Sequence, residues 1–163
     1  MLDYEDNYYY KRYNLCFVCH LLCISVFLCF GRNAKKSYGK RGDACAAVSS
    51  AVYSLLHGAS KEEVLSAVPE KYLNGELYPS VDALEATRCA FCIFRDAESY
   101  TDAVSRACRL GGDTDTIGAI SGGMCGALYG IEAVPKQWID LLDVKERLTL
   151  AVEQVLKRSA GVE

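Results

Sequence analysis

Residues 110–130 constrain the fold of this chain more than any other stretch. They read LGGDTDTIGAISGGMCGALYG, and Gly118, Gly122, Gly126 and Gly130 recur at every fourth position. Because small residues separate the glycines, this spacing predicts a helix with almost no side chains on one face. Each interior glycine costs about 0.5–1 kcal/mol relative to alanine, so we expect this face to lie in very close backbone contact with another element.

Two carboxylates and two hydroxyls stand at the start of this helix. We expect Asp113 or Thr114 to be the N-cap residue, which puts Asp115 and Thr116 in the first turn, where the helix dipole favours anions. Two anions this close repel each other unless a cation or a row of N–H donors intervenes. The segment therefore indicates a site for a hard metal, and the alternative is that both acids only cap and charge the first turn.

Other acidic and glycine-rich motifs fit these residues poorly. An EF-hand loop starting at Asp113 needs an oxygen ligand and a glutamate where the chain has Ile117 and Met124. A D-x-D phosphatase motif follows an apolar strand, whereas residues 111–112 are both glycine. A phosphate-binding P-loop needs a lysine, and none lies between Arg109 and Lys136.

The residues upstream predict a second helix that leads into the acidic cluster. Ser99 and Asp102 have the spacing of a capping box, and Gly111 is placed to end the helix. We therefore expect two helices to meet at a glycine corner that carries the oxygen ligands.

These residues carry a family resemblance. The run 110–130, followed by Val134-Pro135 and Trp138, closely resembles the C-terminal signature of the ADP-ribosylglycohydrolase family. The helices expected near residues 83–94 and 100–110 also occur where the family has helices, so the resemblance covers roughly residues 42–157. It implies a compact all-α domain of orthogonally packed helices.

The resemblance also implies an activity and a metal site. Family members hydrolyse the N- or O-glycosidic bond that links ADP-ribose to a protein or to another ADP-ribose, with two magnesium or manganese ions in the cleft. Carried over by position, Asp113, Asp115 and Thr116 are the metal ligands, and Gly111 and Gly112 contact the substrate. The implied partners are ADP-ribose and ADP-ribosylated proteins, and no catalytic residue is assigned.

The chain also departs from the family pattern. The family's other half-site contains a Thr-Asp-Asp-Thr/Ser motif, and the nearest string, residues 100–103, lacks the second aspartate. We therefore expect residues 42–163 to form the C-terminal half of the domain, with partial or no activity on its own. The alternative is a non-catalytic member of the same scaffold, similar to the crystallins that resemble this family. The linkage cleaved and the oligomeric state stay open.

The first 41 residues differ from the rest. Residues 15–30 are an apolar run of sixteen, shorter than the roughly 18–20 that a membrane helix needs, and a basic stretch follows at 32–41. A weak membrane anchor, a buried helix and a segment foreign to the fold are the three interpretations, and we prefer the last. Residues 16–20 spell C-x-x-C-H, a haem-attachment pattern that arises easily by chance in so cysteine-rich a segment.

Composition limits the class of protein. With 163 residues, 51% hydrophobic, and a net charge of −3, the chain can form one domain with a real core and has no basic excess for binding nucleic acid. We expect the nine cysteines to be mostly reduced thiols in the cytoplasm or nucleus, with Cys89 and Cys92 in the core.

The remaining sequence predicts further helices and no strands. We expect Asp43 to cap a helix that ends at Gly58, Ser60 and Glu63 to form a capping box, and Ser80 to cap a helix over 81–94. Residues 69–80 are expected to form a loop, most often only surface, with a position near a cleft as the alternative. A short helix is expected after Pro135, and a last helix with one apolar face over 144–156.

Overall fold

The protein is described here by a computed structural model, which places residues 38–143, 146–147, 149–151 and 154. These residues are all-α and include no strand, which confirms the expected fold class. The expectations for the apolar run 15–30 and the C-x-x-C-H motif lie outside the described residues. No helix within the described ranges is long and apolar enough to cross a membrane.

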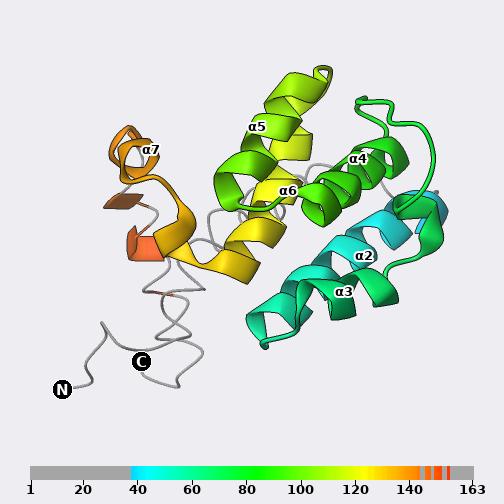
Figure 1. Ribbon diagram of the computed structural model, residues 1–163, viewed down its shortest axis with the longest axis horizontal. Coiled ribbons are helices and arrows are strands. Elements are labelled where there is room, and N and C mark those ends of the chain that lie inside the picture. Colours follow the sequence, from blue (N-terminus) through cyan, green and yellow to red (C-terminus); the bar gives the residue numbers. More distant parts are fainter. Residues whose placement is uncertain (1–37, 144–145, 148, 152–153, 155–163) are drawn as a thin grey trace.

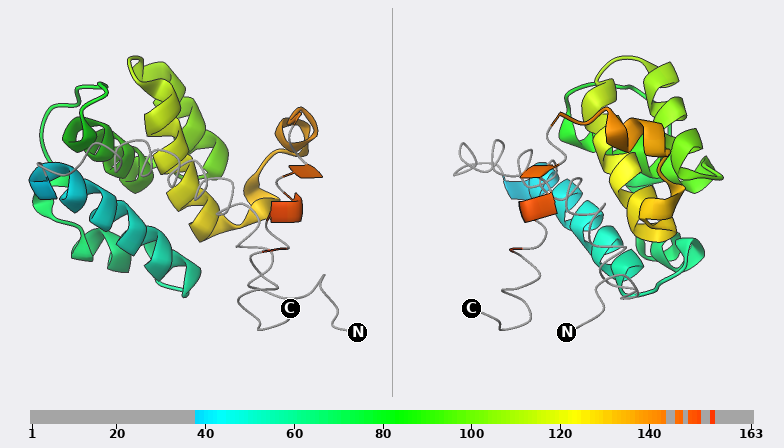
Figure 2. Two further views of the ribbon diagram at one scale, coloured as in Figure 1. Left: turned by 180° about the vertical axis from the view of Figure 1, so that it is seen from behind. Right: turned by 90° about the vertical axis from the view of Figure 1, so that its left-hand side faces the viewer.

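The helices follow one another with short connections and one long loop. In chain order they are α2 (Tyr38–Leu56), α3 (Lys61–Ala67), the 3₁₀ turn η1 (Glu70–Tyr72), α4 (Ala83–Asp96), α5 (Tyr100–Leu110), α6 (Thr114–Tyr129), the 3₁₀ turn η2 (Ile131–Ala133) and α7 (Lys136–Asp140). Helix α6 packs against α5, α4 and α2, and is the centre of the bundle (Figure 1). Helix α7 follows at the far end of α6, away from α2 and α3 (Figure 2).

The core lies where α2, α4, α5 and α6 face one another. Aromatic and aliphatic side chains fill it, and the largest that are fully buried are Tyr72, Phe91, Phe94, Leu55, Ile117 and Met124. Burying each such side chain is worth about 1.5–3 kcal/mol, and this stabilises a helix as rich in glycine as α6. Cys89 and Cys92 are also buried, as expected.

The glycine face of α6 packs against side chains of α5 rather than against its backbone. A Cβ atom built at Gly118 would lie 3.7 Å from the Ala107 Cβ, and one at Gly122 would lie 3.7 Å from the Val104 Cγ2. Both distances are ordinary van der Waals contacts. The expectation of very close backbone approach is therefore wrong at these two positions, because α5 side chains occupy the space that glycine leaves.

Two predicted helix starts are wrong. Helix α2 begins at Tyr38, so Asp43 lies inside the helix. The Asp43 carboxylate forms a 3.1 Å ion pair with Lys71. Helix α4 begins at Ala83 instead of after Ser80. Its N-cap is Asp82, whose carboxylate accepts hydrogen bonds from the first-turn backbone N–H groups.

Two other helix starts are as expected. Ser60 and Glu63 form the complete capping box at the start of α3. Ser99 caps α5 by accepting from the Asp102 N–H, but the Asp102 carboxylate accepts from the Glu98 N–H rather than from that of Ser99. The capping box at α5 is therefore incomplete, because the backbone N–H that the Asp102 carboxylate binds is one residue before the N-cap.

The segment expected as a surface loop at 69–80 is partly buried. It begins with η1, and the Tyr72 side chain is fully buried against Phe91, with the ring centroids 6.0 Å apart. The short helix after Pro135 is present as α7, while the last expected helix, over 144–156, lies partly outside the described residues.

Candidate metal centre

The acidic cluster lies at a sharp corner between α5 and α6. Helix α5 ends at Leu110, and the two glycines that follow both have positive φ, +81° at Gly111 and +64° at Gly112. Glycine adopts this region without the steric cost that a Cβ atom brings, so the chain can reverse direction within three residues. The predicted glycine corner between two packed helices is therefore confirmed.

Asp113 occupies the N-cap position of α6 in an unusual backbone conformation. Its φ and ψ are −79° and 58°, and the Thr114 N–H donates a 2.9 Å hydrogen bond to the Gly112 carbonyl. These are the marks of an inverse γ-turn centred on Asp113. N-cap residues that use their side chains have extended backbones instead. In agreement, the Asp113 carboxylate makes no capping hydrogen bond and is left for side-chain partners.

Those partners are the two other predicted metal ligands. The Thr116 hydroxyl donates a 3.0 Å hydrogen bond to Asp113 Oδ1, and the Asp115 carboxyl group also lies within hydrogen-bonding reach of Asp113. Asp113 and Thr116 are partly buried, and Asp115 is exposed. The structure thus brings all three side chains together in the first turn of α6.

The two carboxyl groups have pKa values shifted in opposite directions. Burial raises the pKa of Asp113, and the hydrogen bond with Asp115 raises it further. The pKa of Asp115 is lowered, first by the hydrogen bond from Asp113 and then by backbone N–H groups of Thr116 and of its own residue. Burial and the neighbouring Asp115 carboxylate thus both oppose the ionisation of Asp113.

This donor set fits a hard divalent cation, because two carboxylates and a hydroxyl are the oxygen ligands that Mg²⁺ and Mn²⁺ prefer. A bound cation would relieve the repulsion between the two carboxylates. Within the described ranges, no group of three or more His, Cys, Asp or Glu side chains is placed to hold a metal. The corner therefore supplies two charged ligands and one neutral ligand, fewer than a protein-only coordination shell requires.

The two glycines of the corner have different surroundings. A Cβ atom at Gly111 would meet nothing within 4 Å, so open space adjoins the backbone there. A Cβ atom at Gly112 would lie only 1.8 Å from the Pro79 carbonyl oxygen. That carbonyl also accepts a 3.3 Å hydrogen bond from the Asp113 N–H. Sequence reasoning missed Pro79, because a contact between two backbones leaves no motif.

Comparison with known proteins agrees with the all-α fold. A sequence model of the family described as ADP-ribosylglycohydrolase matches residues 33–163. The chain is 37% identical over 75 residues to the ADP-ribosylarginine hydrolase Tri1 of Serratia proteamaculans, a match that covers 46% of this chain and 20% of that protein. It is 24% identical over 137 residues to the Tri1 protein of Pseudomonas putida, covering 73% of this chain and 36% of the relative.

A third relative is the ADP-ribosylhydrolase ARH3 of Mus musculus, 34% identical over 90 residues, with 48% of this chain and 22% of that protein covered. The chain therefore spans between 20% and 36% of the length of these three relatives. The family match extends over most of the sequence and includes every described helix. The chain belongs to the ADP-ribosylglycohydrolase family.

Proposed function

We propose that this chain carries one half of a metal site that hydrolyses ADP-ribosyl glycosidic bonds, with Mg²⁺ as the ion and Mn²⁺ able to replace it. The observation that supports this proposal is the cluster of Asp113, Asp115 and Thr116 at the start of α6. There, the Thr116 hydroxyl hydrogen-bonds the Asp113 carboxylate, and the neighbouring Asp115 carboxylate raises the pKa of Asp113.

Each residue of the corner has a role in this proposal. Asp113 and Asp115 supply the negative charge that holds the cation, and Thr116 adds a neutral oxygen and fixes the direction of the Asp113 carboxylate. Bound divalent ions supply Lewis acidity, which polarises a ribose hydroxyl and a water molecule. Gly111 and Gly112 keep side chains away from the corner, and the open space beside Gly111 admits a ligand close to the backbone.

The proposed substrates are proteins that carry ADP-ribose. Two of the relatives are named as hydrolases of ADP-ribosylarginine, and a third as an ADP-ribosylhydrolase. An ADP-ribosyl group offers vicinal ribose hydroxyls and a diphosphate, both of which are oxygen ligands for a hard cation. Free ADP-ribose, as the product, is expected to bind at the same corner.

We further propose that these 163 residues alone turn over substrate slowly or not at all. Affinity for hard cations falls as carboxylate ligands are removed, and the described residues offer two at this corner. Two carboxylates and one hydroxyl would hold such an ion only weakly, so few molecules would carry it.

A turnover assay tests the proposal. The chain is incubated with an arginine-ADP-ribosylated protein, and released ADP-ribose is measured in Mg²⁺ and in EDTA, for the wild type and for Asp115→Ala. We expect slow release at most, confined to the wild type in Mg²⁺. Rapid release that persists in EDTA or in Asp115→Ala would overturn the metal assignment. A chain that binds neither Mg²⁺ nor ADP-ribose would instead be a non-catalytic member of the scaffold.

A further inference from the structure

The long loop between η1 and α4, residues 73–82, touches the candidate metal centre through backbone atoms. It rises beside the turn between α5 and α6, as Figure 1 shows. The Pro79 carbonyl oxygen accepts the 3.3 Å hydrogen bond from the Asp113 N–H and lies over Gly112, where a Cβ atom would approach it to 1.8 Å. The loop therefore packs directly on the residue that begins α6.

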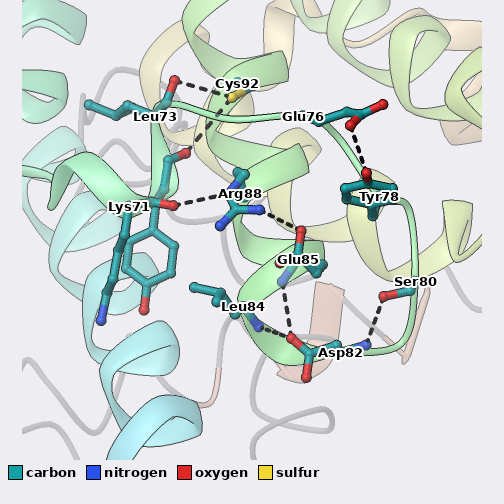
Figure 3. A network of polar contacts seen from close by, with 11 residues as sticks. Lys71, Leu73, Glu76, Tyr78, Ser80, Asp82, Leu84, Glu85, Arg88 and Cys92 are labelled. Atoms are coloured by element: carbon teal, nitrogen blue, oxygen red, sulfur yellow. Dashed lines mark hydrogen bonds and ion pairs between the residues drawn. The ribbon is translucent and has the colours of Figure 1, made fainter.

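Two arginines of α4 hold the start of this loop in place. Arg95 donates a 2.7 Å hydrogen bond from its guanidinium to the Leu73 carbonyl, and Arg88 donates a 3.0 Å bond from Nε to the Lys71 carbonyl. The Arg88 guanidinium also lies 3.6 Å from the position of a Cβ atom at Gly75, so it packs along the loop. Figure 3 shows Arg88 between the Lys71 carbonyl and Glu85, with which it forms a 2.6 Å ion pair.

The rest of the loop is held by contacts of its own. Tyr78 donates a 2.6 Å hydrogen bond to Glu76 inside the loop. Ser80 accepts from the Asp82 N–H, and Asp82 in turn caps α4 (Figure 3). Leu77 packs against the hydrophobic core. A loop attached at its start, middle and end has little freedom to move. The Pro79 carbonyl is therefore held in a fixed position relative to Gly112 and Asp113.

We propose that the 73–82 loop is a positioning element for the metal centre, with the Pro79 carbonyl setting the γ-turn at Asp113 and the direction of its carboxylate. The inference rests on the proposed function for its metal, and on the contacts above for its geometry. The N–H of Asp113, at the centre of the γ-turn, has no helical hydrogen bond. The Pro79 carbonyl is the acceptor that orders this N–H.

The same contact explains why residue 112 is a glycine. Its positive φ turns the chain, and its missing side chain lets the Pro79 carbonyl reach the Asp113 N–H. A side chain at this position would meet a backbone oxygen that cannot rotate away, so the loop and the corner would separate.

The test loosens the loop without changing any residue of the corner. Arg95→Gln removes the guanidinium that bonds the Leu73 carbonyl at the start of the loop, and Arg88→Gln removes the one that bonds the Lys71 carbonyl in η1, just before the loop. Arg106→Gln is the matched control, because the ion pair and hydrogen bond of Arg106 go to Asp102 on its own helix, α5. Arg95 and Arg106 have nearly equal side-chain exposure, 42% and 43%, so Arg95→Gln keeps the comparison valid if Arg88→Gln unfolds.

The first readout needs no metal. Amide hydrogen exchange at Asp113, followed by NMR, is expected to speed up about tenfold in the two loop variants, the effect of losing roughly 1.4 kcal/mol of local stability. Arg106→Gln is expected to leave the exchange rate within twofold of the wild type, a factor that corresponds to about 0.4 kcal/mol. Unchanged exchange at Asp113 in both loop variants would overturn the positioning role.

The second readout is Mn²⁺ affinity, measured from the electron paramagnetic resonance signal of the free ion. The loop variants are expected to weaken binding about five- to tenfold, the equivalent of one net hydrogen bond, with the control unchanged. Equal weakening in Arg106→Gln would contradict a specific role for the loop. If the wild type binds no Mn²⁺ while exchange at Asp113 still responds to the loop variants, the metal proposal fails and the positioning of Asp113 stands.

Discussion

Thr116 Oγ1 donates a 3.0 Å hydrogen bond to Asp113 Oδ1 across the first turn of α6. We predict that Thr116→Val weakens Mg²⁺ binding tenfold or more, because it removes one oxygen ligand and the bond that orients another. The free energy of unfolding should fall by only about 0.5–1.5 kcal/mol, the net value of one hydrogen bond. Thr116→Ser keeps the hydroxyl and is the control. Calorimetric titration measures the binding, and equal affinities for the two variants would contradict the role of the hydroxyl.

Asp113→Asn is predicted to raise the melting temperature of the metal-free protein at neutral pH while abolishing metal binding. Burial and the neighbouring Asp115 raise the pKa of Asp113, so this residue stabilises the fold while protonated and ceases to do so as pH rises through that pKa. An asparagine amide donates to Asp115 at every pH. The advantage of the variant should therefore be smallest near pH 4 and grow toward pH 7, as measured by thermal unfolding.

Added Mg²⁺ provides the companion measurement for this pair. It should raise the melting temperature of the wild type in proportion to the logarithm of its concentration above the dissociation constant, and leave Asp113→Asn unchanged. A variant that is less stable than the wild type in EDTA at pH 7 would refute the unfavourable interaction between the two carboxylates.

Gly118→Ala and Gly122→Ala are predicted to be neutral or to stabilise the protein by about 0.5–1 kcal/mol each. The new methyl groups would meet α5 side chains at 3.7 Å, an ordinary contact distance. Gly130→Ala is the contrasting variant, since φ there is +80° and the methyl group would lie 3.0 Å from a Glu132 carboxylate oxygen. It should destabilise by about 1–3 kcal/mol. Urea unfolding distinguishes these outcomes, and losses for the first two would restore the tight-backbone explanation.

Cys125 and Cys108 are predicted to differ sharply in thiol reactivity. Burial in α6 raises the pKa of Cys125 to about 12, whereas Cys108 is exposed on α5. Because the thiolate is the nucleophile, iodoacetamide at pH 8 should label Cys108 in the folded protein and reach Cys125 only when the chain unfolds. Peptide mass spectrometry reads out both sites, and equal labelling rates would show that α6 is less well packed than described.

The sequence was most informative where neighbours in the chain determine the structure. Asp113, Asp115 and Thr116 lie within four residues, so any helix starting there brings them together. The Ser60 capping box also depends only on residues three apart. The start of α4 was misplaced, because Ser80 and Asp82 can both cap, and only the backbone angles select between them.

Contacts between distant backbones could not be predicted. The bond from the Asp113 N–H to the Pro79 carbonyl joins residues that are far apart in the chain and involves no side chain. The environment of Gly118 and Gly122 depends on which α5 side chains face them, and the glycine spacing alone does not contain that information. The burial of Tyr72 could not be predicted for a related reason. It stands in a polar segment, and only its packing against Phe91 of α4 buries it.

Calorimetric titration of the chain with ADP-ribose in Mg²⁺ tests most directly whether the corner at Asp113, Asp115 and Thr116 is a metal-dependent site for ADP-ribose. We predict a measurable heat of binding at millimolar ligand for the wild type, lost in EDTA and in Asp115→Ala. Absence of heat, or identical titrations for the wild type and Asp115→Ala, would contradict it.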